Sequence, residues 1–217
     1  MNQPYKIEQV SQPAQLISLA NAKAFLRVDS NDEDLEIEGM IKAATKLAES
    51  FCNKRFASQQ IAMWLDYFPF SRSNDWWDGV KDGTVNDLYK TSDEIIIPLG
   101  PIISLEALKT FDDADTEYTM DPSLYYVDKN GDFPKIVLRN GQIWPVTVLR
   151  RASGIKIEMT VGHSTVPDDI ILAVKMIIAK MYENRGDSKD EESFGQLGFV
   201  IPPTAASILS TNRQFRL

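Results

Sequence analysis

The residues between Asn31 and Phe51 constrain the fold more than any other part of this 217-residue chain. Their sequence is NDEDLEIEGMIKAATKLAESF, in which apolar side chains recur three and four positions apart. This spacing predicts an amphipathic α-helix with Asn31 as its N-cap and carboxylates in its first turn. An isolated helix of this length is marginal in water, so its apolar face must pack against other segments. The predicted core residues on this face are Ile37, Ile41, Ala44, Leu47 and Phe51.

Two further segments have the same periodicity and can supply that packing. A short helix is predicted over residues 19–27, with Ser18 as its N-cap and Leu26 in the core. A later helix is predicted from Pro167, a residue suited to the first helical position, to a stop at Gly186. Its predicted core residues are Val174, Ile177 and Met181.

Between these helices the apolar pattern changes to alternation, which indicates β-strands. Asn140-Gly141 is a turn signal of the kind that closes a hairpin. An edge strand is also predicted near the N-terminus. The predicted strands cover residues 5–10, 60–68, 94–99, 102–111, 124–127, 135–138 and 154–161.

The predicted fold class is therefore α+β. A small bundle of two N-terminal helices and one late helix carries an inserted, mostly antiparallel β unit. The expected helical core covers residues 15–56 and 166–186, the β insertion 57–165 and a C-terminal tail 187–217, all within a single subunit, 1–217.

Composition excludes several classes of protein. The net charge of −8 argues against a protein that coats DNA or a membrane. No run of 18 apolar residues and no apolar signal segment is present, so we expect a protein made in a cytoplasm. The single cysteine, Cys52, excludes an internal disulfide and is expected to be a buried thiol.

A search for catalytic and metal-binding patterns gives no candidate. His163 is the only histidine and lies in a predicted loop. Neither a nucleophile elbow nor a glycine-rich phosphate loop occurs. Acidic pairs such as Asp112-Asp113 and Asp168-Asp169 are most simply a turn and a helix start. We therefore expect no catalytic, cofactor-binding or metal-binding residues.

Two regions are candidates for partner binding. Trp76 and Trp77 lie in a long polar segment, where they either cap the β unit or anchor a partner. The C-terminal tail has two arginines and no acidic residue from Ile201 onward, and it either packs on its own subunit or docks on another protein. The tail residues concerned are Ile208, Leu209, Arg213, Phe215 and Arg216.

Several motifs in order along the chain resemble the head–tail connector family of tailed bacteriophages, also called head-completion or adaptor proteins. The first resembles the family's "SL-x-x-AK-x-x-LRV" segment, followed by an acidic turn and a helix. Later matches are a "P-x-x-I-x-x-A…YENR" helix at 167–185, an "LP-x-x-P" segment around Pro98 and Pro101, Trp144-Pro145, and an "IL-x-x-x-R" ending at 208–213. The residues of the first segment are Ser18, Leu19, Ala22, Lys23, Leu26, Arg27, Val28, Asp32, Asp34, Ile37, Ile41, Ala43, Ala44 and Phe51.

This resemblance implies a structural virion protein without enzymatic activity. Such proteins form a ring below the portal protein, bind the next neck or tail-completion protein, and extend the channel through which DNA passes without specific binding. The resemblance further implies a homo-oligomeric ring of about twelve copies in the virion neck, assembled in the host cytoplasm and not bound to a membrane.

Two alternatives from other classes remain. One is a metal-dependent phage enzyme or DNA-packaging factor that uses its carboxylates, which magnesium or manganese calorimetry would detect. The other is an interaction module unrelated to viruses, which the neighbouring genes would reveal.

Overall fold

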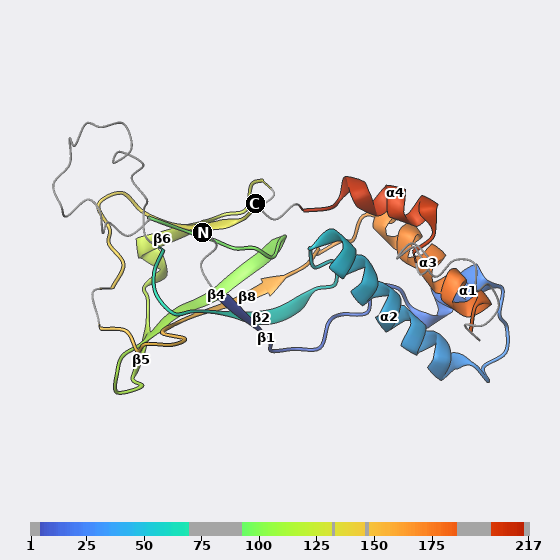
Figure 1. Cartoon of the computed structure of the whole chain (residues 1–217), viewed down its shortest axis with the longest axis horizontal. Helices are drawn as coiled ribbons and strands as arrows, with labels where there is room; N and C mark the ends of the chain where they lie inside the picture. The colour runs from blue at the N-terminus through green and yellow to red at the C-terminus, as the bar shows by residue number, and fades with distance from the viewer. Residues whose placement is uncertain (1–4, 70–92, 132, 146–147, 186–200, 215–217) are drawn as a thin grey trace, which may run out of the picture. The chain divides into compact units, whose positions relative to one another are not determined.

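The computed structural model describes residues 5–69, 93–131, 133–145, 148–185 and 201–214, and these form two compact units (Figure 1). A sheet unit contains Met1–Gln12 and Gln59–Val161, and a helical unit contains Pro13–Ser58 and Gly162–Leu217. The predicted α+β class is confirmed. The helical unit extends further than the expected helical core, because it also includes the described part of the C-terminal tail.

Two helices open the helical unit. Helix α1 covers Leu19–Leu26, and the Ser18 side chain caps it as predicted by accepting the N–H of Asn21. Helix α2 covers Asp34–Cys52 and begins later than the sequence predicts. The predicted N-cap, Asn31, instead accepts a hydrogen bond from Lys23 Nζ at 2.7 Å, and the same ammonium pairs with Asp34.

Two more helices complete this unit. Helix α3 covers Asp168–Glu183, so Pro167 is the residue before the helix and not its first residue. Helix α3 ends before Gly186, which lies outside the described residues; the backbone N–H of Asn184 caps it by bonding to Lys180. Helix α4, Pro203–Thr211, forms within the predicted C-terminal tail, whose apolar spacing suits a short helix.

The four helices share one apolar core. Leu26, Leu47, Phe51 and Met181 are partly buried at its border. The predicted core residues that are fully buried are Ile37, Ile41, Ala44, Val174 and Ile177. Because α2 and α3 meet through these side chains, segments more than a hundred positions apart in the sequence stabilise each other.

The sheet unit contains two antiparallel sheets. The larger has the order β1-β2-β8-β4-β5, and the smaller has the order β3-β7-β6. A short 3-10 helix, η3 (Pro122–Leu124), precedes β6. The strands are β1 Tyr5–Gln9, β2 Gln59–Leu65, β3 Glu94–Ile96, β4 Ile102–Phe111, β5 Glu117–Thr119, β6 Tyr125–Asp128, β7 Lys135–Leu138 and β8 Ile155–Val161.

Most of these strands agree with the predictions, but three differ. Strand β2 ends at Leu65 and not at residue 68. Strand β3 ends at Ile96 and not at Leu99; Pro98, which lacks an N–H donor, cannot extend the ladder. Strand β5 was not predicted, because three residues are too few for alternation to be recognised. Predicted edge strand β1 does form, and it pairs with β2.

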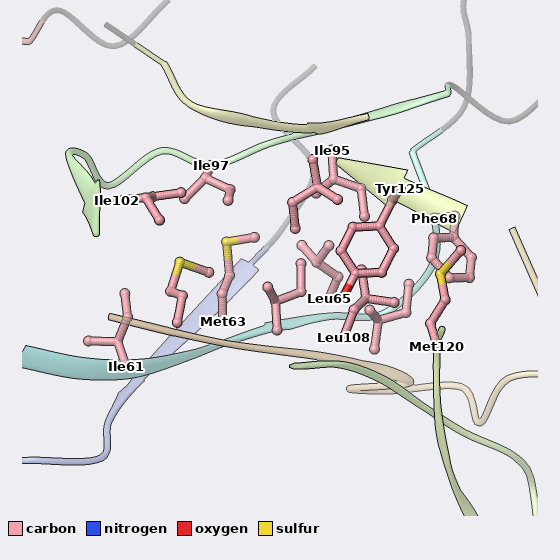
Figure 2. Close-up of a cluster of buried hydrophobic side chains, with 14 of the residues drawn as sticks. Ile61, Met63, Leu65, Phe68, Ile95, Ile97, Ile102, Leu108, Met120 and Tyr125 are labelled. Atoms are coloured by element: carbon pink, nitrogen blue, oxygen red, sulfur yellow. The ribbon is translucent and has the colours of Figure 1, made fainter. Parts of the chain in front are cut away.

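The inner faces of the two sheets enclose a second apolar core. Alternate residues of β2 and β8 point into it, among them Met63 and Leu65 (Figure 2). The smaller sheet contributes Ile95 and Tyr125 from the opposite side (Figure 2). In β7 and β8, the period-2 pattern of the sequence therefore corresponds to one buried and one outward face.

The insertion begins and ends in paired strands. The β2–β8 register runs from Leu65↔Ile155 to Gln59↔Val161. Just beyond it, Gly162 has φ +107°, and a Cβ there would lie 2.4 Å from the carbonyl oxygen of Ala57. Only glycine fits this close approach, which brings the end of the α2 segment beside the start of the α3 segment.

A buried carboxylate supports the turn after α2. Glu49 Oε1 accepts the backbone N–H groups of Phe56 at 2.8 Å and Ala57 at 3.0 Å. Burial raises the pKa of Glu49, although these N–H groups and the nearby Arg55 oppose the shift. The cost of burying the carboxylate therefore exceeds what these contacts return to its charged form, while its oxygen still satisfies two backbone N–H groups of the turn.

The first prediction concerns the shared helical core. Ile41→Ala or Ile177→Ala should lower the free energy of unfolding by roughly 2–5 kcal/mol, because each leaves a cavity between α2 and α3. Chemical denaturation measures this change. Leu35→Ala is the control, since Leu35 on α2 is 85% exposed and its truncation should change stability by at most about 0.5 kcal/mol. Equal stability of all three variants would contradict a shared core.

A second prediction concerns pH. The pKa of Glu49 is raised in the folded state above its ordinary value of 4.5. The stability that this group contributes to the folded protein is therefore lost as pH rises from 4.5 through the raised pKa. Relative to Glu49→Gln, the wild-type protein should therefore lose stability across this window and then reach a plateau. Urea denaturation from acid to neutral pH measures the difference, with Glu38→Gln on the same helix as a charge control. A difference that grows in favour of wild type with rising pH would contradict the prediction.

Candidate partner-binding surfaces

Four of the seven predicted partner anchors lie outside the described residues. These are Trp76, Trp77, Phe215 and Arg216. The other three lie on or just after helix α4. Their positions show which part of the C-terminal tail packs on its own subunit.

Helix α4 packs against its own subunit. Leu209 and Ala205 are fully buried in the helical core, and Ile208 is partly buried at its border. The Cys52 thiol donates a hydrogen bond to the carbonyl oxygen of Leu209 at 3.3 Å. Burial raises the pKa of this thiol to about 11. Leu209 is thus a core residue and is not available to a partner.

The residues after α4 are also bound to α2. The Gln214 N–H donates to the Cys52 carbonyl oxygen at 2.8 Å, and the Asn53 side chain donates to the Gln214 carbonyl oxygen at 3.1 Å. The guanidinium of Arg213 lies over the Phe51 ring, 5.3 Å from its centroid. For residues 201–214, the alternative in which the tail covers its own subunit is therefore the one observed.

The YENR segment at the end of α3 forms a polar cluster with α2. Arg185 pairs with Glu33 at 2.7 Å, and the Tyr182 hydroxyl donates to the same carboxylate at 2.6 Å. The hydrogen bonds from Arg185 and Tyr182 lower the pKa of Glu33. This cluster ties the C-terminal end of α3 to the start of α2. The YENR motif therefore has a structural role in holding these two helices together.

The outer face of the larger sheet carries charges in transverse rows. The strand registers align Lys6, Trp64, Lys156 and Lys109 in one row across β1, β2, β8 and β4. The next row contains Glu8 and Glu158. Sequence analysis missed these rows, because alternation identifies the outward residues of each strand but not the register between strands.

Most charges on this face are neutralised within it. Glu158 pairs with Lys156 at 2.7 Å and Lys109 at 3.5 Å, and these contacts lower the pKa of Glu158. Glu117 of β5 pairs with Lys109 at 3.0 Å. Lys6 takes part in none of the ion pairs that the described residues form. The face is therefore mixed in charge, with one unpaired cation at its β1 edge.

A shallow groove of about 330 Å³ lies at this edge. It is lined by Lys6, Ile7, Glu8, Trp64, Arg150 and Ser153. The Trp64 indole donates to Glu8 at 2.9 Å, and the Arg150 guanidinium lies 4.4 Å from the centroid of the Phe111 ring. The groove is open and has an apolar and a cationic wall, which suits a protein segment more than a small molecule.

The remaining candidates give no chemical site. His163 is half-buried beside Phe56, and burial lowers its pKa. Among the described residues, no group of three or more His, Cys, Asp or Glu side chains is arranged to hold a metal ion. None of the described helices is both long enough and apolar enough to span a membrane.

Comparison with solved structures finds the same fold in gene transfer agent (GTA) particles. A chain from the neck of an empty GTA particle, computed with C6 symmetry, superposes with a TM-score of 0.73; the alignment covers 98% of this chain and 97% of that one. A chain from the virion of the native GTA particle gives 0.68, with 97% and 96% covered. A third, from the neck of the native particle computed with C12 symmetry, gives 0.63, with 98% and 97% covered.

Each of these chains is 18% identical to this one, so the likeness is one of fold. No curated protein matches the sequence. A family model described as "Head completion protein" matches residues 15–215. Because this match spans nearly the whole sequence, the chain belongs to the head completion protein family, as its motifs predicted.

Proposed function

We propose that this protein is a structural subunit of a virion neck, where copies form a ring that joins the DNA-filled head to the tail. The observation that carries the proposal is the family match over residues 15–215. The fold shared with chains from GTA necks, one of them computed with C12 symmetry, supports a ring in the same position. The ring would lie below the portal protein and extend its DNA channel.

The charge of the chain is compatible with this role. A net charge of −8 gives no general attraction for phosphates, so DNA would slide past the ring and would not be held by it. On the outer face of the sheet, two lysines of the transverse row, Lys109 and Lys156, are paired with Glu117 and Glu158. Such internally neutralised surfaces contribute little to DNA affinity.

We further propose that the last residues of the chain contact the portal protein. Phe215 and Arg216 directly follow Gln214 in the sequence, and the backbone of Gln214 is bound to α2. An aromatic side chain next to a guanidinium is a favourable interface anchor. Trp76 and Trp77 remain proposed anchors for the portal or for the next neck protein.

The third prediction concerns assembly. We expect the purified protein to form rings when concentrated or when mixed with portal protein, with twelve copies in the virion by analogy with the neck computed with C12 symmetry. Native mass spectrometry and electron microscopy of neck complexes measure the copy number. Monomers at all concentrations, with and without portal protein, would contradict the proposal. Magnesium-dependent cleavage of DNA or peptidoglycan would favour the enzymatic alternative.

The fourth prediction separates docking from folding in the C-terminal tail. Deletion of residues 215–217 should leave the melting temperature unchanged, because α4 and its contacts remain, and should abolish binding to portal protein. Deletion of residues 204–217 also removes Leu209 and Ala205 from the core, so the melting temperature should fall by several degrees or more. Thermal unfolding and co-sedimentation with portal protein measure the two effects. Normal portal binding by the shorter deletion would reject the proposed anchor.

A further inference from the structure

We propose that the two edges of the five-stranded sheet are the surfaces through which copies of this protein join head to tail. Strand β5 of one copy adds to strand β1 of the next, in parallel orientation. This inference rests on the proposed ring and specifies the contact that would build it.

The two edges lie at opposite ends of one sheet. The order β1-β2-β8-β4-β5 leaves the outer side of β1 and the outer side of β5 without a paired strand among the described residues. A cyclic ring needs two different surfaces that complement each other, and free edges at the two ends of one sheet provide them. Joining such edges continues the hydrogen-bonded sheet from copy to copy.

The direction of the strands determines how the edges meet. Every neighbouring pair in this sheet is antiparallel, so with five strands β1 and β5 run in the same direction. A cyclic rotation between neighbouring copies preserves that direction, so β5 would add to β1 in parallel. A two-fold axis would instead pair β1 with β1 in antiparallel orientation and give a closed dimer.

The free backbone groups fit a parallel register. The N–H of Val10 donates to the carbonyl oxygen of Gln60. Because hydrogen-bonded residues alternate along an antiparallel strand, the backbone N–H and C=O groups of Ile7 and Gln9 point away from β2. On the other edge, the N–H of Met120 donates to the carbonyl oxygen of Leu108. By the same alternation, the backbone N–H and C=O groups of Glu117 and Thr119 point away from β4.

With Ile7 opposite Tyr118 of the next copy, both free groups of Ile7 find partners. Its N–H meets the carbonyl oxygen of Glu117, and its carbonyl oxygen meets the N–H of Thr119. This is the pattern of a parallel ladder, in which one residue bonds to the two residues that flank its opposite number.

The side chains favour the same register. On the outer face, the unpaired Lys6 would lie beside Glu117, at the groove next to Trp64. On the inner face, Ile7 and Tyr118, which are 37% and 46% exposed, would cover each other. A slip of two residues would place Glu8 beside Glu117, and two like charges side by side disfavour that arrangement.

The edge contact is short, since β5 has only three residues. A single such contact is weak, and parallel pairs are slightly less stable per residue than antiparallel pairs. Closure of a ring lets every copy make the contact twice, so assembly depends steeply on protein concentration or on a template such as the portal.

The test is site-directed cross-linking between Ile7→Cys and Tyr118→Cys. The protein carrying both changes should give a ladder of covalent oligomers on mild oxidation, and a mixture of the two single variants should give a dimer. The native Cys52 does not interfere, because it is buried and its thiol has a pKa of about 11. Tyr126→Cys combined with Ile7→Cys is the matched control, since Tyr126 is 45% exposed on an edge strand of the other sheet.

A charge exchange supplies the second measurement. Lys6→Glu and Glu117→Lys should each reduce the fraction of protein in rings at a fixed concentration, and the double variant should recover it. Thermal unfolding of each variant checks that the subunit itself remains folded. Recovery in the double variant is not expected if either residue acts only within its own subunit.

The possible outcomes separate this inference from the proposed function. Rings that form without cross-links between positions 7 and 118 overturn the edge contact and leave the ring proposal standing. Cross-links of Ile7→Cys with itself indicate antiparallel β1 pairs and also overturn it. Absence of rings in wild-type protein, with and without portal, refutes both.

Discussion

The pairing of β2 with β8 is the interaction on which the rest of this structure depends. Residues 66–154 separate these two strands in the sequence, yet their register extends from Leu65↔Ile155 to Gln59↔Val161. The two chain segments stay close beyond the strands. Gly162 lies against Ala57, and the His163 N–H donates to the Phe56 carbonyl oxygen. The loop-closure entropy of bringing α2 and α3 together is thereby offset by strand pairing.

The helical unit uses that proximity to bury its apolar faces. Helices α2 and α3 form the centre, and α1 and α4 each contact both. Two polar contacts fix the ends of these elements: Glu49 holds the turn after α2, and Glu33 holds Arg185 at the end of α3. Glu49 satisfies two buried backbone N–H groups that would otherwise lack a partner, whereas Glu33 forms a surface ion pair.

In the sheet unit, alternate residues of the strands face the core and the outer surface. Inward residues form an apolar core, whereas outward residues form rows of charge that neutralise one another. The groove beside Trp64 and the unpaired Lys6 break that balance at one edge only. An asymmetric edge of this kind suits the ring that we propose, because cyclic assembly requires two unlike surfaces.

Sequence alone determined the fold class, the family, most of the strands and the buried faces of helices α1, α2 and α3. These depend on local periodicity and on motifs, which are visible without knowing what packs on what. Sequence did not reveal that Asn31 binds Lys23 and does not cap α2, or that β5 exists, since both depend on neighbours or on very short segments.

The tertiary structure decided which surfaces are free. The sequence left open whether Leu209 packs on its own subunit or docks on a partner, and the structure folds this part of the tail into α4 and buries Leu209 against Cys52. The charged rows of the sheet follow from strand register, which side-chain alternation cannot specify. Both outcomes have one physical reason: exposure is set by contacts between segments distant in sequence, and a local pattern of residues contains no information about those contacts.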